Sequence, residues 1–248
     1  MGDGRAEHYH VRTPLLESWV LSQVLGTTVY LKCENVQPAG SFKIRGIGHY
    51  CQEMAKKGCR HLVCSSGHAS LVQELKADLG SPPGALVLAV GGGGLLAGVA
   101  AGLEQVGWQD VPVVAVETRG ADSFHAALRA GKLVTLPDIT SVARCLGAKT
   151  VAAGALACAK QLKVLSEVVA DAEAVSAVQR FLDDERMLVE PACGAALAAV
   201  YSGVLGRLQA EGRLPSPLAS VVVIVCGGNS IDSRELQALK PAGPEVKA

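Results

Sequence analysis

Short runs of aliphatic, mostly β-branched residues recur along the chain, and each run predicts a buried strand. The runs cover residues 28–33, 60–66, 85–90, 111–117 and 220–226. Longer segments with helical periodicity lie between them, at residues 41–58, 95–107, 171–185 and 191–212. Strands that alternate with helices predict an α/β protein built on a mainly parallel sheet.

Three of these segments begin with residues that favour a helix N-terminus. Ser41 and Asp171 are expected to act as N-caps, and Pro191 suits a first helical turn. These residues fix where the predicted helices begin.

The composition limits the class of protein. The 248 residues include 23 basic and 23 acidic side chains, and 49% are hydrophobic. A neutral chain is a poor partner for nucleic acid or for a membrane surface, and this hydrophobic content is enough for a folded core. The length fits one large domain or two small ones.

Eight cysteines lie mostly in apolar runs, and their spacing does not match a zinc site. They predict reduced thiols of an intracellular protein. The polar start of the chain lacks the apolar stretch of a signal peptide, and no apolar run approaches the roughly 20 residues that cross a membrane. We therefore expect a cytoplasmic protein.

Four consecutive glycines, Gly91, Gly92, Gly93 and Gly94, follow one predicted strand and open a helix. Such a loop can aim successive backbone N–H groups at one anion, and the helix N-terminus adds positive potential. A flexible turn would also explain the run, although four glycines carry an entropic cost that a plain turn does not need. The run is neither a Walker A motif nor a Rossmann fingerprint, so the predicted phosphate belongs to something other than ATP or NAD.

Lys43 stands between Phe42 and Ile44, and these neighbours predict a partly buried amine. Partial burial favours the neutral, nucleophilic form of lysine. A reactive lysine together with a phosphate cradle suggests pyridoxal phosphate (PLP), which needs both. The simpler interpretation of Lys43 alone is an ordinary exposed helix residue. A generic nucleotide-binding module would explain the glycines but not the Ser-Phe-Lys segment.

Several motifs resemble the fold-type-II PLP enzymes, and among them the L-serine dehydratase/L-threonine deaminase family with its mammalian serine dehydratase-like branch. The motifs are KCENVQPAGSFKIRG, AVGGGGLLAG, LGAKTV, DDERMLVEPACGAALAA and VVIVCGGN. The resemblance covers nearly the whole chain. It implies an α/β fold of the tryptophan synthase β type, with a large parallel-sheet domain and a truncated small domain.

The resemblance also implies roles for individual residues. Lys43 would hold PLP and take the substrate Cα proton, and Phe42 would pack against the ring. The phosphate would bind the backbone amides of Gly91, Gly92, Gly93, Gly94 and Leu95. Cys226 would face the ring nitrogen as a neutral partner, although a core thiol is the alternative reading of this residue.

A monovalent cation site, expected to hold potassium, is implied in the same way. The ligands would be the Glu117 carboxylate together with oxygens of Ala121, Ser123, Leu146 and Ala148. Taken alone, Glu117 would be read as a solvated residue at a strand end.

The pattern breaks after the second long strand. Ser65, Ser66 and Gly67 begin the loop that grips the substrate carboxylate in the family, but the expected asparagine does not follow. Roughly 80 residues are absent relative to family members, about the size of a small domain. Residues 1–34 and 68–248 would form the large domain, and residues 35–67 a remnant of the small one.

Two functions remain open. The first is a homodimeric lyase that converts L-serine to pyruvate, or L-threonine to 2-oxobutanoate, with release of ammonia. The second is a catalytically inactive, truncated relative that retains dimerisation or weak PLP binding.

Overall fold

The computed structural model describes residues 9–47 and 66–239. Within this part of the chain, six strands form one sheet in the order β1-β2-β6-β3-β4-β5. The strands are β1 Leu15–Ser18, β2 Val29–Cys33, β3 Ala85–Ala89, β4 Val113–Thr118, β5 Val164–Val169 and β6 Val221–Val225. The edge pair β1 and β2 is antiparallel, and all other neighbours are parallel. The predicted α/β fold on a mainly parallel sheet is confirmed.

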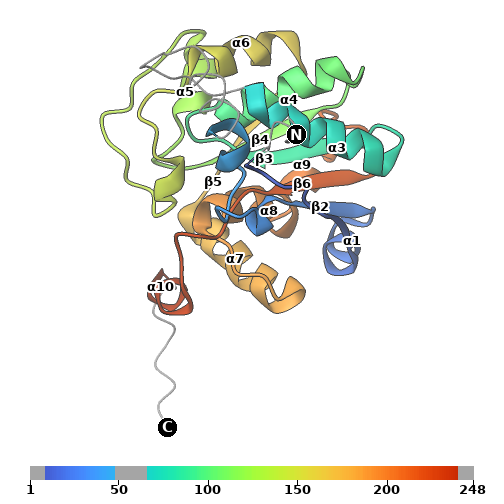
Figure 1. Cartoon of the computed structure of the whole chain (residues 1–248). Coiled ribbons are helices and arrows are strands. Elements are labelled where there is room, and N and C mark those ends of the chain that lie inside the picture. Colours follow the sequence, from blue (N-terminus) through green and yellow to red (C-terminus); the bar gives the residue numbers. More distant parts are fainter. Residues whose placement is uncertain (1–8, 48–65, 240–248) are drawn as a thin grey trace, which may run out of the picture.

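Helices cover both faces of this sheet (Figure 1). Helices α3, α4, α5 and α6 lie on one side, and α1, α7 and α8 lie on the other. The helix bounds are α1 Trp19–Leu25, α3 Ala69–Leu79, α4 Gly94–Gln105, α5 Ser123–Ala130, α6 Ala153–Gln161, α7 Asp171–Glu185, α8 Pro191–Tyr201, α9 Val204–Ala210 and α10 Ser233–Leu239. Three short 3₁₀ turns are η1 Glu34–Val36, η2 Ser66–His68 and η3 Arg144–Leu146.

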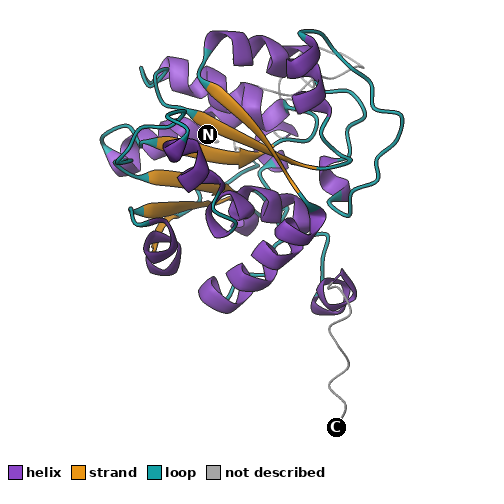
Figure 2. Cartoon of the chain, turned by 180° about the vertical axis from the view of Figure 1, so that it is seen from behind, coloured by secondary structure: helices purple, strands orange, loops and turns teal. Residues whose placement is uncertain are grey.

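Four of the five predicted strands are confirmed as β2, β3, β4 and β6. Most of the fifth, residues 60–66, lies outside the described residues, and Ser66 begins η2 rather than ending a strand. Strands β1 and β5 were not predicted. Figure 2 shows the twisted sheet from behind, with helices on either side of it.

Three helix predictions need correction. The N-cap of α7 is Ala170, whose N–H donates to the Glu173 carboxylate at 2.7 Å, whereas Asp171 is the first helical residue. The predicted helix 191–212 is two helices, because Gly203 adopts a positive φ of 73° between α8 and α9. Helical backbone after β2 begins at Lys43, one residue later than an N-cap at Ser41 predicts, and continues to the last described residue of that segment.

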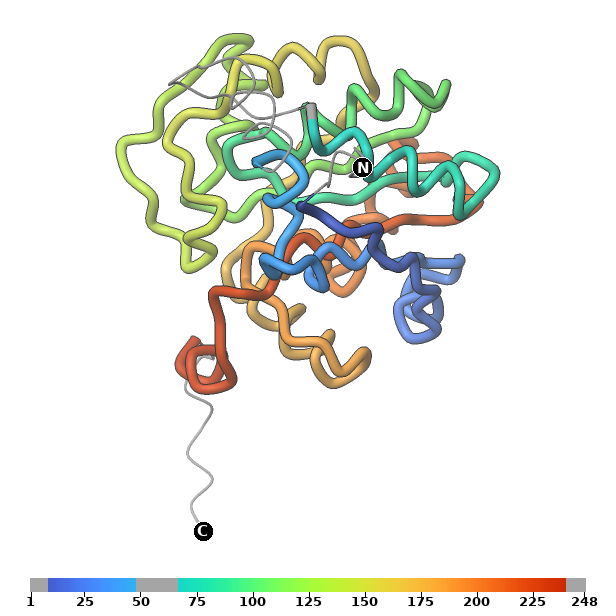
Figure 3. The backbone as a smooth tube through the Cα atoms, in the orientation of Figure 1, coloured from blue at the N-terminus to red at the C-terminus, as the bar shows by residue number. Residues whose placement is uncertain are grey.

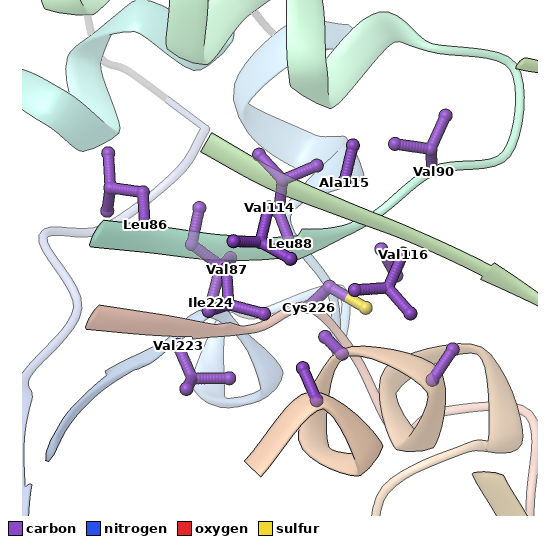
Figure 4. Close-up of a cluster of buried hydrophobic side chains, with 14 of the residues drawn as sticks. Leu86, Val87, Leu88, Val90, Val114, Ala115, Val116, Val223, Ile224 and Cys226 are labelled. Carbon is purple, nitrogen blue, oxygen red and sulfur yellow. The ribbon is translucent and has the colours of Figure 1, made fainter. Parts of the chain in front are cut away.

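The core consists of aliphatic side chains from the central strands, packed on α8 (Figure 4). Helix α8 is buried over almost its whole length, and most of its residues are small. Small residues allow the close approach of α7, since a Cβ on Gly194 would lie 2.3 Å from the carbonyl oxygen of Ala174. Helix α8 therefore packs directly against the central strands and covers one face of the sheet.

The last strand in the sequence, β6, lies between β2 and β3 at the centre of the sheet. The segment after β2 therefore runs beside the end of β6, although the two are far apart along the chain (Figure 3). Ser41 pairs with Gly227 as an isolated antiparallel bridge. The carboxyl ends of β2, β6 and β3 meet here, which is where open parallel sheets bind ligands.

None of the described helices is by itself long and apolar enough to cross a membrane. Helices α8 and α9 reach the length and apolar composition of a membrane span only when they are taken together, and a bend of 44° separates them.

Candidate active site

A cavity of about 230 Å³ opens at the carboxyl ends of the central strands. Its wall contains residues from the segment after β2, the glycine loop after β3, the residue after β6 and the turn η3. The described lining residues are Phe42, Lys43, Ile47, His68, Ala89, Val90, Gly91, Gly92, Gly93, Gly94, Leu95, Leu96, Cys145, Leu146, Glu190, Ala192 and Cys226. The cavity thus brings together all the residues that the sequence predicted for cofactor binding.

The glycine loop is shaped by close packing behind it. Gly93 has a φ of +85°, and a Cβ at this position would lie 2.4 Å from the Cβ of Ala155. A Cβ on Gly91 would lie 3.1 Å from the Cα of Leu146. Gly92 has more room, with Ala148 Cβ at 3.9 Å as the nearest atom. Backbone alone forms this part of the wall, directly before α4, and such a cradle fits a phosphate group.

The segment that carries Lys43 is fastened to the end of β6. The N–H of Phe42 donates to the carbonyl of Cys226 at 3.1 Å. Phe42 and Ile44 are half-buried, but Lys43 is exposed, so the predicted partial burial of its amine is wrong for this structure. Lys43 is instead exposed and lines the cavity, so a carbonyl compound can reach its side chain.

Cys226 directly follows β6 and lies near the aliphatic side chains of β3 and β4 (Figure 4). A hydrogen bond with Cys193, and burial, raise the pKa of the Cys226 thiol well above its ordinary value. The thiol therefore stays neutral, and a neutral partner leaves a pyridine nitrogen unprotonated.

Glu190 was not predicted, although it lines the same cavity. Glu190 as a whole is 6% exposed, and its carboxylate accepts hydrogen bonds from Ser230 Oγ and, at 3.4 Å, from Cys145 Sγ. It precedes Pro191 at the start of α8, and its N–H donates to the carbonyl of Gly227 at 3.3 Å. Glu190 and Cys226 thus lie at the same end of the cavity. They are brought together only by the fold, so no local sequence pattern could have predicted their proximity.

Three of the predicted cation ligands are buried at the end of β4 and the start of α5. Glu117 is fully buried, and its carboxylate accepts from the N–H groups of Phe124 at 2.9 Å and His125 at 2.7 Å. Burial raises the pKa of Glu117 to about 8, against the lowering effect of these two donors. Ala121 and Ser123 are also fully buried, and Ser123 Oγ has no hydrogen-bond partner within the described part of the chain.

Leu146 and Ala148, the other two predicted ligands, lie close to the glycine loop. Leu146 packs behind Gly91, and Ala148 lies behind Gly92. Val90, just before the loop, donates from its N–H to the carbonyl of Val116, the neighbour of Glu117. Leu146, Ala148 and the strand that carries Glu117 are thus neighbours of the loop. A buried carboxylate and an unpaired hydroxyl fit a bound cation, which would favour the ionised form of Glu117.

The three residues predicted to contact substrate are placed differently. Ser65 lies outside the described residues. Ser66 begins η2, and Gly67 is buried but does not line the cavity. A Cβ on Gly67 would lie 2.1 Å from the carbonyl oxygen of Arg45, so this glycine packs against the Lys43 helix instead.

A buried network of ion pairs holds the Lys43 helix in place. Arg45 is fully buried, and its guanidinium contacts both Glu34 at 2.7 Å and Glu74 at 2.7 Å. Lys32 Nζ reaches the same Glu74 carboxylate at 2.5 Å. Two cations face two anions, so the buried charges are compensated. The network connects β2, η1, α3 and the helix that begins at Lys43.

The sequence model of the family described as "Pyridoxal-phosphate dependent enzyme" matches residues 6–68 and 61–227. The chain belongs to this family. A human relative named "Serine dehydratase-like" is 59% identical over 314 aligned positions, which cover 95% of each chain. The human "L-serine dehydratase/L-threonine deaminase" is 46% identical over 313 positions, covering 94% of this chain and 95% of the relative.

Solved structures of PLP-dependent enzymes of fold type II share the fold. A fungal L-serine ammonia-lyase from Rhizomucor miehei superposes with a TM-score of 0.84 at 31% identity, covering 94% of this chain and 98% of that one. Maize serine racemase superposes with a TM-score of 0.78 at 22% identity, covering 93% of each chain. The predicted family and fold type are confirmed.

The lengths of these alignments show a gap. An alignment of 314 positions is longer than the 248-residue chain, so at least 66 positions of the human relative have no counterpart here. The family model also matches in two segments, which overlap at residues 61–68.

Proposed function

We propose that this chain binds pyridoxal phosphate at Lys43 and derives from L-serine/L-threonine ammonia-lyases. The observation that carries the proposal is the convergence of three groups on one cavity: the Lys43 amine, the glycine loop and the neutral Cys226 thiol. The names of the relatives, serine dehydratase and threonine deaminase, support hydroxy amino acids as substrates.

Each of these groups would have a separate task. Lys43 would attach the cofactor, the backbone N–H groups of Gly91 to Leu95 would bind its phosphate, and Phe42 would pack against its ring. When bound, pyridoxal phosphate withdraws electrons from the Cα of an amino acid that it holds, which makes the Cα proton removable. Cys226, as a neutral partner, limits this withdrawal, and that favours elimination over transamination.

Lys43 would be the base that takes the Cα proton in the lyase reaction. The β-hydroxyl of serine or threonine leaves as water, and the resulting enamine takes up water to give pyruvate or 2-oxobutanoate and ammonia. The reaction needs the substrate carboxylate to be held and water to be excluded while the proton moves.

This chain would catalyse that reaction poorly. The structural reason is the site itself, where Lys43 is exposed and Gly67 packs on Arg45 rather than lining the cavity. The alignment gap of at least 66 positions supports the loss of most of the small domain, with residues 35–67 as its remnant and residues 1–34 and 68–248 as the large domain. An inactive chain that binds the cofactor weakly and still dimerises is the alternative.

The proposal also covers a bound cation, the oligomeric state and the cellular compartment. Potassium would bind the Glu117 carboxylate with oxygens of Ala121, Ser123, Leu146 and Ala148. A homodimer belongs to the proposal because the resemblance to the dehydratase family implies one. The described cysteines are all free thiols, which supports a reducing compartment such as the cytoplasm.

Visible absorption tests the cofactor assignment. Pyridoxal phosphate added to the purified chain should give the absorption band of a lysine-bound cofactor, and reduction with borohydride followed by peptide mapping should find the label on Lys43. Lys43→Ala should give no such band, while Lys149→Ala, which changes another exposed lysine, should behave like the parent. A label on any other lysine would refute the assignment.

A further inference from the structure

His68 lies in the cavity wall but has no role in the assignment above. It is the last residue of η2, directly before α3, and it is 4% exposed. Its imidazole ring packs against Phe42 with 5.2 Å between the ring centroids and an interplanar angle of 54°. A buried histidine beside the residue that precedes Lys43 is positioned to contact whatever fills the cavity.

The backbone on either side of His68 is clamped to the rest of the site. The Ser70 hydroxyl donates to the carbonyl of Gly67 at 2.9 Å and accepts from Arg45 Nη1 at 3.0 Å. The turn η2 also packs against α4, whose first turn continues the glycine loop. His68 is therefore held beside Phe42 in the Lys43 segment, and it lines the same cavity as the glycine loop.

The charges around the cavity show which end an anion should occupy. Among the described lining residues, only Lys43 and His68 have side chains that can carry positive charge, and Glu190 is the sole carboxylate. Glu190 lies at the Cys226 end, so an anion is disfavoured there. The first turn of α4, which continues the glycine loop, contains no acidic residue that would oppose a phosphate.

Attachment of a carbonyl compound to Lys43 uses its amine. Among the described lining residues, His68 is then the remaining side chain that can supply a cation or a charge-assisted hydrogen bond to the phosphate. A phosphate monoester carries between one and two negative charges near neutral pH, and backbone amides supply dipoles but no net charge.

We propose that His68 donates a hydrogen bond from its imidazole to the phosphate of the cofactor and so contributes to phosphate affinity. The proposal rests on cofactor binding at Lys43. The competing explanation is a packing role, in which His68 only supports the ring of Phe42.

Paired measurements with pyridoxal phosphate and pyridoxal separate these explanations, because the two compounds differ only in the phosphate. We expect His68→Phe, which keeps an aromatic ring beside Phe42, to weaken pyridoxal phosphate binding by about tenfold, as for loss of one charge-assisted hydrogen bond. Pyridoxal binding should change by less than about twofold. His68→Gln retains an N–H donor and should recover most of the lost affinity, while His68→Leu should not.

The melting temperature of each cofactor-free variant controls for folding. In addition, the dissociation constant of inorganic phosphate, measured without cofactor, should be higher in His68→Phe than in the parent chain, and this comparison can be repeated in His68→Leu. Equal losses for pyridoxal and pyridoxal phosphate, or no loss for either, would overturn the role of His68 and leave cofactor binding intact. A parent chain that binds neither compound would overturn both proposals.

Discussion

The N–H of Phe42 donates a hydrogen bond to the carbonyl of Cys226, with 3.1 Å between nitrogen and oxygen. This bond joins the residue that precedes Lys43 to the residue that follows the central strand. The lysine and the neutral thiol are therefore fixed relative to each other by the backbone and not by their side chains. Substitutions that shift the end of β6 should also shift Lys43.

The glycine loop gives a graded test of the phosphate cradle. Gly92→Val should fold, because the nearest atom to a Cβ there is 3.9 Å away, but its side chain should obstruct the cradle and lower cofactor affinity at least about tenfold. Gly93→Ala should also lower the melting temperature, since φ is +85° and its Cβ would meet Ala155. Titration of cofactor absorption and thermal unfolding measure the two effects.

Gly154→Ala is the matched control for this series, because Gly154 lies in α6 with no atom near its added Cβ. It should bind the cofactor like the parent. Unchanged affinity in Gly92→Val would show that the phosphate does not occupy the loop.

Stability should depend on pH through Glu117. Burial raises the pKa of this carboxyl to about 8 from an ordinary value of 4.5, so the folded state holds a proton that the unfolded state releases. Its contribution to stability is complete below about pH 4.5 and is lost as the pH rises through about 8, by an amount on the order of a few kcal/mol. Urea unfolding at several pH values in this window should show the decline.

Glu117→Gln should abolish this part of the decline, whereas Glu17→Gln, at an exposed position, should leave it unchanged. Potassium should stabilise the parent chain more at the upper end of the pH window than at the lower end, because a cation favours the ionised carboxylate. A potassium effect of equal size in Glu117→Gln would place the ion elsewhere.

The ion pairs of Arg45 should dominate the stability of the site. Arg45→Met leaves the fully buried Glu34 carboxylate without its main cation, and we expect a loss of roughly 3–5 kcal/mol in the free energy of unfolding. Arg12→Ala removes an ion pair with Asp78 from an exposed arginine and should cost less than about 1 kcal/mol. If Arg45→Met loses as little unfolding free energy as is expected for Arg12→Ala, the buried network is not stabilising.

Turnover measures the consequence of the alignment gap. With pyridoxal phosphate and potassium in excess, we expect this chain to release pyruvate from L-serine at least about 100-fold more slowly than a full-length relative, because a substrate displaced by about 1 Å can already cost this much. Turnover within tenfold of that relative would show that the missing segment is dispensable. The residual activity should disappear in Lys43→Ala.

The central strands and the glycine loop could be predicted because their signals are local. β3 is a continuous aliphatic run, and four glycines follow it at once. β5 was not predicted because Ser166 and Glu167 interrupt its apolar pattern. In the folded chain Glu167 meets Arg207 at 2.5 Å and Arg213 at 2.9 Å, and such distant partners are not visible in the sequence.

The same distinction applies to the site. Lys43, Gly91 and Cys226 were predicted because each lies in a recognisable motif. Glu190 and His68 were not predicted as site residues, because their places in the cavity depend on how α8 and η2 pack. Lys43 is exposed, as the simpler interpretation of an ordinary helix residue predicted, because its apolar neighbours Phe42 and Ile44 are only half-buried themselves.

The central position of β6 has a consequence for biosynthesis. Until residues 221–225 have left the ribosome, β2 and β3 have no common neighbour. The nascent sheet then consists of the antiparallel pair β1 and β2, separate from β3, β4 and β5. Both halves then present unpaired strand edges, which are prone to pair with other chains. The cavity that contains Cys226 cannot be complete before this strand is in place, and a chain that ends before residue 221 should be insoluble.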